Sequence, residues 1–159
     1  MGKIYKTLIY DGQISLSVLD TTDVVNKAIE LHGLTPLCAA GLGRALTVAS
    51  FMATSLKDEN EKLSVTIDGN GVGGKIVVCA DGNLNVRGSI VNPHADLPLK
   101  PNGKLDVGGL VGNEGTITVV KNLGLKEPYV GKCKLVSGEI GEDFAAYYAY
   151  PRRSPSACL

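Results

Sequence analysis

The cysteines are the side chains of this sequence best suited to redox or metal chemistry, and they are widely separated. They are Cys38, Cys79, Cys133 and Cys158. No Cys-x-Cys or Cys-x-x-Cys spacing occurs, so the sequence encodes neither a thioredoxin-like pair nor a zinc knuckle. Cys38 and Cys79 lie in apolar runs, where cysteine usually packs as a small hydrophobic residue. Cys158, near the chain end, is expected to be exposed and the most readily oxidised. We therefore predict no metal ligands and no cofactor in this chain.

Acid–base or nucleophilic catalysis has little support. His32 and His94 are the only histidines, and neither falls in an evident Ser/His/Asp or Cys/His grouping. Glu139, Glu142 and Asp143 could serve as paired carboxylates. Acidic residues at the start of a helix are already explained by the helix dipole. We predict no catalytic residues and no enzymatic activity.

The run from Gly69 to Lys75 matches two phosphate-binding patterns, G-x-G-x-x-G and G-x-x-x-x-G-K. Two features argue against a phosphate cradle. Position 76 is isoleucine, which offers no hydroxyl for Mg²⁺, and the β-branched residues that follow predict a strand where such a cradle needs a helix. We expect a glycine-rich hairpin loop, with a nucleotide or small-molecule site as the alternative.

The N-terminal segment predicts a β-hairpin over residues 4–19, because Asp11-Gly12 separates two apolar-rich runs. In the second run apolar residues alternate with polar ones, and the apolar ones are Ile14, Leu16 and Val18. This period of two predicts one face against the core and one in water.

Two helices are predicted next. Thr21 or Thr22 can cap the first, which ends near Gly33. The second runs from residues 35–36 to about residue 56 and is apolar nearly all round. It is long enough to span a bilayer, but Arg44 and several small or hydroxylated residues favour a buried core helix. The small residues would let neighbouring elements approach closely.

The rest of the chain predicts strands and one final helix. The strands are expected at residues 62–67, 75–80, 84–91, 105–111, 116–121 and 132–136. The helix is expected to follow an N-cap at Ser137 and to end near Tyr150. The fold class is therefore α+β, with mostly antiparallel sheets around a long buried apolar helix and a C-terminal helix. We expect residues 1–159 to form a single domain.

The net charge and the N-terminal residues further limit the functions that the sequence allows. The formal net charge is zero, with no cluster of basic residues, so no nucleic-acid partner is expected. Zero net charge also offers little resistance to self-association. The first residues lack a basic segment followed by an apolar one, which predicts no secretory signal, a cytoplasmic and reducing location, and no membrane partner.

Residues 86–148 resemble the redox-regulated 33 kDa chaperonin (heat-shock protein 33) family in the order and spacing of several motifs. The most specific motifs are LKEPY at residues 125–129 and LVSGEI at residues 135–140. Others are VRG at 86–88, NP at 92–93, GKLDVG at 103–108, ED at 142–143 and YY at 147–148. Residues 4–56 fit the beginning of the family more loosely.

The resemblance implies an ATP-independent holdase of the bacterial cytoplasm, which binds unfolded or misfolded client proteins under oxidative and heat stress. It also implies a C-terminal Cys-x-Cys and Cys-x-x-Cys zinc switch, and none of the four cysteines here matches a switch cysteine. The expected chain is thus the N-terminal core without the zinc domain, and client-contacting residues are not identified. The segment Pro151-Arg152-Arg153 departs from the family pattern.

Ending at Leu159, such a core would leave a sheet edge open, so we expect a homo-oligomer, a dimer being the simplest. A truncated scaffold that binds no client is the other alternative.

Overall fold

The computed structural model describes residues 2–149, which form seven strands and four helices. In chain order these are β1 (Lys3–Ile9), β2 (Ile14–Asp20), α1 (Thr22–His32), α2 (Pro36–Ala53), β3 (Lys62–Asp68), β4 (Ile76–Asp81), β5 (Val86–Ile90), α3 (Val107–Val111), β6 (Thr116–Asn122), β7 (Tyr129–Lys134) and α4 (Gly141–Ala149). Strands β1 and β2 form a hairpin, and the others form one antiparallel sheet in the order β5-β4-β3-β6-β7. The predicted α+β class is confirmed.

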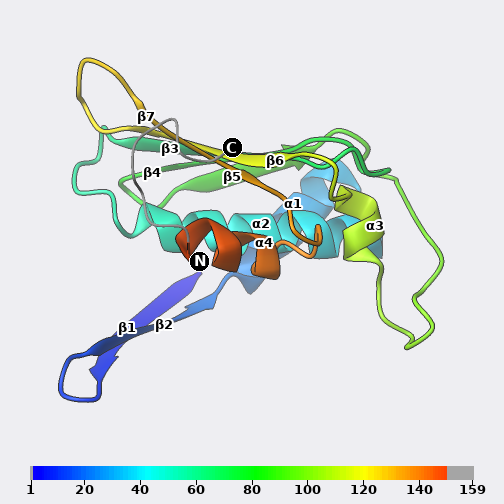
Figure 1. Ribbon diagram of the computed structural model, residues 1–159, viewed down its shortest axis with the longest axis horizontal. Helices are drawn as coiled ribbons and strands as arrows, with labels where there is room; N and C mark the ends of the chain where they lie inside the picture. The colour runs from blue at the N-terminus through cyan, green and yellow to red at the C-terminus, as the bar shows by residue number, and fades with distance from the viewer. Residues whose placement is uncertain (1, 150–159) are drawn as a thin grey trace.

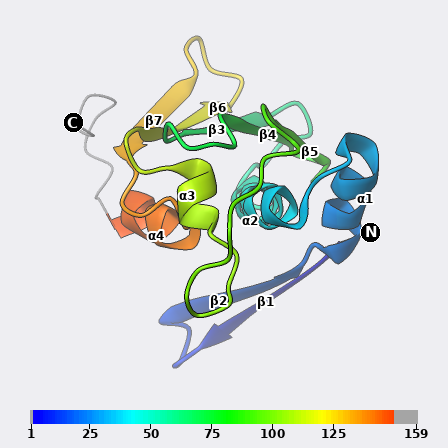
Figure 2. The same ribbon diagram turned by 90° about the vertical axis from the view of Figure 1, so that its right-hand side faces the viewer.

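Helix α2 lies against one face of the five-stranded sheet, with α1, α3 and α4 around it (Figures 1 and 2). Side chains alternate along the central strand β3. Leu63, Val65 and Ile67 are buried beneath the sheet, whereas Ser64 and Thr66 are only half-buried on its other face. The hydrophobic core therefore lies between the sheet and α2.

Helix α2 begins where the sequence predicts. The Thr35 hydroxyl accepts a hydrogen bond from the Cys38 amide, and Pro36 occupies the first helical position. Among the described residues, this helix alone is long and apolar enough to cross a membrane by length and composition. Of its residues, 61% are buried inside the protein, which agrees with the prediction of a core helix.

Small residues on α2 allow close packing, as predicted. A Cβ atom added to Gly41 would lie 2.6 Å from the side chain of Leu110 on α3. One added to Gly43 would lie 3.1 Å from the side chain of Val25 on α1. Two helices thus pack directly on the α2 backbone at these glycines.

The N-terminal hairpin forms as predicted, but the prediction that its apolar face packs on the core is wrong. Ile14, Leu16 and Val18 are 48%, 46% and 55% exposed. The hairpin projects from the helical side of the protein (Figure 1), and Lys6 in the middle of β1 donates to the Thr54 hydroxyl just beyond the end of α2. Alternation within a strand specifies that one face is apolar, but it does not specify on which side the body of the protein lies.

The predicted strand at residues 105–111 is also wrong, because residues 107–111 form the short helix α3. Asp106 caps this helix by accepting a hydrogen bond from the Gly109 amide at 2.9 Å. A short apolar run fits a buried helix as well as a strand, and periodicity alone does not separate them.

Two boundaries near the C-terminus differ from the prediction. Strand β7 covers residues 129–134 rather than 132–136, and α4 begins at Gly141 rather than directly after Ser137. Tyr150, the predicted helix end, lies outside the described residues. The residues between β7 and α4 instead form a loop that is bonded to the carboxylate of Asp143.

Candidate functional site

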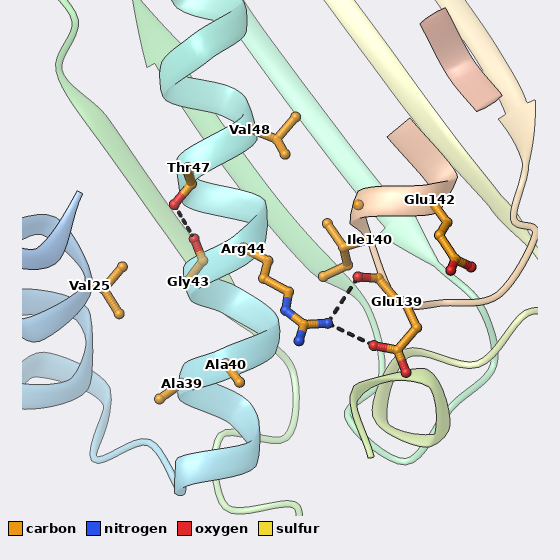
Figure 3. A pocket seen from close by; sticks show the side chains of 11 residues that line it. Val25, Ala39, Ala40, Gly43, Arg44, Thr47, Val48, Glu139, Ile140 and Glu142 are labelled. Carbon is orange, nitrogen blue, oxygen red and sulfur yellow. Dashed lines mark hydrogen bonds and ion pairs between the residues drawn. The ribbon is translucent and has the colours of Figure 1, made fainter. Parts of the chain in front are cut away.

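An open apolar groove of about 710 Å³ lies on the side of α2 that faces away from the sheet (Figure 3). Helix α1 forms one wall, and the segment that enters α4 forms the other. The lining residues are Val25, Ala39, Ala40, Gly43, Arg44, Thr47, Val48, Glu139, Ile140, Gly141 and Glu142. Most of them are small or apolar, so the groove suits an apolar ligand better than a charged one.

The floor of the groove is a helical stripe. Ala40, Gly43 and Thr47 lie three and four residues apart and therefore share one side of α2. The Thr47 hydroxyl donates to the carbonyl of Gly43 at 2.9 Å, as Figure 3 shows. Since this hydroxyl has a backbone partner, it does not require one from a ligand.

A cluster of four charged side chains borders the groove. Arg44 donates from Nη1 to the carboxylate of Glu139 at 2.8 Å and to the backbone carbonyl of the same residue at 3.1 Å (Figure 3). Lys100 also donates to the Glu139 carboxylate and lies 3.5 Å from a carboxylate oxygen of Asp106. The cluster joins α2, the 91–106 loop and the wall segment, which are far apart in the sequence.

The cluster shifts the ionisation of two of its members. The hydrogen bond from Lys100, followed by that from Arg44, holds the pKa of Glu139 below its usual value, although partial burial opposes this. The hydrogen bond to Glu139 raises the pKa of Lys100 in turn. Both groups are therefore charged at neutral pH and hold the wall segment by charge-assisted bonds.

A buried carboxylate fixes the same wall from the other side. Asp143 is fully buried, and its Oδ1 accepts hydrogen bonds from the amides of Val136, Ser137 and Gly138 at 2.7, 2.9 and 3.3 Å. Its Oδ2 accepts from the amide of Ile140 at 2.8 Å. One side chain thus accepts hydrogen bonds from four of the five amides of residues 136–140, a role that the helix-dipole explanation of this acid did not include.

The other two acidic candidates are separated by the structure. Glu139 enters the charged cluster, whereas Glu142 is exposed on the rim of the groove. The described residues do not bring these three carboxylates together as an acid–base pair. Of the histidines, His32 lies 3.1 Å from the carbonyl of Gly88 through Nε2, and His94 lies in the exposed loop after β5.

The cysteines of the described residues do not form a metal site. Cys38 is buried and its thiol donates to the carbonyls of Asn92 and Ala95, each at 3.3 Å. Cys79 is on β4 and Cys133 on β7, with β3 and β6 between them. Residues 2–149 contain no group of three His, Cys, Asp or Glu side chains that could hold a metal ion. Cys158 lies outside the described residues.

The glycine-rich run from Gly69 to Lys75 is the connection between antiparallel strands β3 and β4, as the sequence favoured. Three of its amides donate to carbonyls within the protein. The Gly71 amide donates to Val111 and the Gly73 amide to Leu110, at 3.0 and 2.9 Å. A phosphate cradle needs a helix start, whereas this loop leads into strand β4.

Sequence reasoning missed the groove, although two signals were present. The small residues of this helix, which include Ala39, Ala40 and Gly43, were interpreted only as close-packing residues, and Arg44 only as an argument against membrane insertion. The ion pair between Arg44 and Glu139 spans 95 residues of sequence, so no local pattern could have predicted it. A lone arginine in an apolar helix does, however, require a partner or an exposed side.

Fold and groove together define an α+β protein with an open apolar groove beside its central helix. Comparison with known proteins identifies the family within this fold class. The family model described as Hsp33 protein matches residues 2–159. The chain belongs to the Hsp33 family, which confirms the resemblance found in its motifs.

The individual relatives agree. A 33 kDa chaperonin of Clostridium tetani is 46% identical over 155 residues, covering 98% of this chain and 53% of the relative. The 33 kDa chaperonin of Acetivibrio thermocellus is 48% identical over 147 residues, which cover 92% of this chain and 49% of that relative. The crystal structure of the 33 kDa chaperonin from Thermotoga maritima superposes with a TM-score of 0.86 at 38% identity, covering 93% of this chain and 50% of that one. The chain spans about half the length of the curated relatives it matches.

Proposed function

We propose that this chain is the core of an ATP-independent holdase chaperone of the cytoplasm, which binds apolar segments of unfolded proteins during oxidative or heat stress. The observation that carries the proposal is the open apolar groove beside α2 in a chain of the Hsp33 family. The activity is binding without bond chemistry.

The dimensions of the groove suit this role. Its volume of about 710 Å³ lies within the range of about 300–1,000 Å³ found for ligand pockets. A short peptide segment can place a few apolar side chains in such a space. The floor of Ala40 and Gly43 is smooth because these side chains are small, so it favours no particular side-chain shape. A holdase that accepts many clients needs this low selectivity.

The rim supplies polar contacts without closing the groove. Glu142 and Arg44 are exposed there, with opposite charges. Groups of both signs can contact the peptide groups of a bound segment while its side chains enter the groove. The net charge of zero means that clients of either sign are tolerated.

A light-scattering assay on a heat-denatured reporter enzyme tests the proposal. The wild-type chain is expected to suppress aggregation. Ala40→Asp places a charge in the groove floor and should raise the ratio of chaperone to reporter needed for half suppression by about fivefold or more. Ala145→Asp adds the same charge at an exposed site of α4. It should change the ratio of chaperone to reporter needed for half suppression by less than twofold, as is usual for surface substitutions.

Two outcomes would overturn the assignment. A folded wild-type chain without suppression would favour a scaffold that binds no client. Equal effects of the two aspartate substitutions would move client binding away from the groove. We also expect no dependence on ATP and little response to peroxide or reductant, because the described cysteines form no dithiol pair. Complete loss of activity on reduction would contradict this redox insensitivity.

We further propose that the chain works as a homo-oligomer. The zero net charge and the exposed apolar hairpin support self-association.

A further inference from the structure

A second cavity, of about 560 Å³, lies between the N-terminal hairpin and the end of α2. Figures 1 and 2 show the hairpin on the side of the helices that faces away from the five-stranded sheet. Strands β1 and β2 line one side of the cavity, and α2, β6 and α4 contribute to the other. None of its described lining residues is acidic. Its basic and hydroxyl-bearing residues are Lys6, Ser15, Ser17, Thr54, Ser55 and Lys121.

Lys121 is a basic residue at a core position of β6. The two preceding residues on the same face of the strand, Ile117 and Val119, are fully buried, and its partner on β3 is the buried Leu63. The alternation along β6 therefore favours an apolar side chain at this position. Lys121 is instead 8% exposed, and its ammonium group donates to the Ser55 hydroxyl at 3.4 Å. It brings a positive charge to the inner wall of the cavity.

Lys6 reaches the same helix end from the hairpin. Its ammonium group donates to the Thr54 hydroxyl at 2.7 Å. The hydroxyls of Thr54 and Ser55 donate in turn to carbonyls of the last turn of α2, at 2.8 and 2.7 Å. Each hydroxyl is thus an acceptor for one of the two lysines. Because Thr54 and Ser55 are adjacent in the chain, both ammonium groups lie at the same end of the cavity.

The end of α2 offsets only part of this charge. The C-terminus of a helix carries about half a negative charge, whereas each ammonium group carries a full positive one. None of the acidic side chains in residues 2–149 forms an ion pair with Lys6. Two like charges at one helix end also repel each other. An anion held between the two lysines would therefore be attracted to both.

We propose that this cavity binds a small organic phosphate, whose phosphate group lies between the ammonium groups of Lys6 and Lys121. The inference goes beyond the proposed chaperone activity and does not rest on it. A phosphate monoester carries a charge of about −1.5 to −2 at pH 7, which matches two ammonium groups. The hydroxyls of Ser15 and Ser17 supply further donors on the hairpin side.

The rest of the cavity suits an apolar body attached to the phosphate. Leu16, Phe51, Met52 and Tyr148 line this part. The rings of Phe51 and Tyr148 are in edge contact, with their centroids 6.1 Å apart. A flat apolar group can pack against such rings. Inorganic phosphate would contact the lysines but would leave this apolar part unfilled, so an organic phosphate should bind more tightly.

A ligand in this position would connect the hairpin to the body of the protein. Lys6 and the two serines belong to the hairpin, whereas Lys121 belongs to the five-stranded sheet. A phosphate group bound to both lysines therefore bridges the two sheets. Because such a ligand binds only the folded protein, it should also raise the melting temperature.

Isothermal titration calorimetry with phenyl phosphate tests the site. We expect a dissociation constant of about 1 mM or tighter for a probe of this size. Lys6→Met and Lys121→Met should each raise it about tenfold or more, because each removes one charge-assisted hydrogen bond. Lys3→Met is the matched control. It removes the same charge from the other face of β1, outside the cavity, and should change the dissociation constant by less than about twofold.

Two further probes separate the parts of the ligand. Phenol lacks the phosphate group and inorganic phosphate lacks the ring, so each should bind about tenfold more weakly than phenyl phosphate. Phenol that binds as tightly as phenyl phosphate would overturn the role of the lysines. Inorganic phosphate that binds as tightly would overturn the role of the apolar part of the cavity.

The remaining outcomes decide the proposal as a whole. Absence of phenyl phosphate binding up to about 10 mM, or equal weakening by Lys3→Met and Lys6→Met, would overturn it. In two-dimensional NMR spectra the probe should shift the amide signals of Ser17 and Ser55. Shifts confined to the groove around Gly43 would place the probe elsewhere and would also overturn the site.

Thermal unfolding without the probe distinguishes binding from a purely structural role. Methionine keeps the length and the apolar stem of lysine, so both substituted chains should still fold. If the lysines serve only to stabilise the end of α2, their substitution lowers the melting temperature and the wild-type chain shows no binding of phenyl phosphate. Suppression of reporter aggregation is measured separately, so failure of the phosphate site leaves the proposed chaperone activity intact.

Discussion

The carboxylate of Asp143 offers the sharpest test of how the groove wall is held. This side chain is fully buried and accepts four backbone hydrogen bonds of 2.7–3.3 Å. Asp143→Asn keeps one oxygen, which can still serve the three amides bound to Oδ1. The Ile140 amide, bound to Oδ2, would then face an NH₂ group and lose its acceptor.

The expected cost follows from that single lost bond. A hydrogen bond to a charged acceptor contributes about 1.5–3 kcal/mol, and an unsatisfied buried donor adds a penalty, so we expect Asp143→Asn to cost about 2–3 kcal/mol. At about 2–4 °C for each kcal/mol in a chain of this size, the melting temperature should fall by about 4–12 °C. Asp143→Ala leaves all four amides without an acceptor and should cost more than about 4 kcal/mol.

Urea unfolding followed by circular dichroism measures both changes, and Glu142→Gln is the matched control. Glu142 is the adjacent acid in the first turn of α4, but it is exposed. Its interaction with the helix dipole is worth about 0.3–1 kcal/mol at most. If Asp143→Asn costs no more than Glu142→Gln, the carboxylate acts only through the dipole and the bonding argument is refuted.

Two further predictions concern the charged cluster and the glycine loop. The pKa of Glu139 is lowered by Lys100 and Arg44, so its stabilisation is present above about pH 4.5 and is lost as the pH falls through the lowered value. Glu139→Gln should therefore lower the melting temperature at pH 7, and the difference from the wild type should shrink as the pH falls below about 4.5; a difference that stays constant throughout the acid range would contradict the ion pair. Gly71→Ala should destabilise the protein by about 1–3 kcal/mol with or without ATP, because the added Cβ would collide with the α3 backbone. Val72→Ala, at an exposed neighbour, should be nearly neutral, and an ATP-induced rise in melting temperature that Gly71→Ala abolished would revive the nucleotide alternative.

Elements with strong local signals could be predicted from the sequence. The Asp11-Gly12 turn marked the hairpin, Thr35 with Pro36 marked the start of α2, and Gly33 marked the end of α1. In the structure Gly33 has a φ of 60°, and its amide donates to the carbonyl of Ile29. These signals depend on a few adjacent residues, so tertiary contacts do not alter them.

The errors came from features that only the folded chain decides. Residues 107–111 contain too few positions for a period to be measured, and their helix is fixed by packing on the loop that contains Gly71 and Gly73. Asp143 was recognised as an acid at a helix start, but its bonds reach back to residues 136–140, which the sequence had assigned partly to a strand. The ion pair of Arg44 with Glu139 likewise joins distant segments.

The apolar character of α2 on all sides can now be divided between two roles. Leu42 and Leu46 face the sheet and are at most 1% exposed, so they stabilise the core. Ala40 and Val48 are half-buried on the opposite side, where α1 and the α4 wall leave the groove between them. The polar bonds of Glu139 and Asp143 hold that wall, whereas apolar contacts hold the sheet. A substitution that removes the hydrogen bonds of Glu139 or Asp143 should therefore alter the groove more than the core, because the two sides of α2 depend on different interactions.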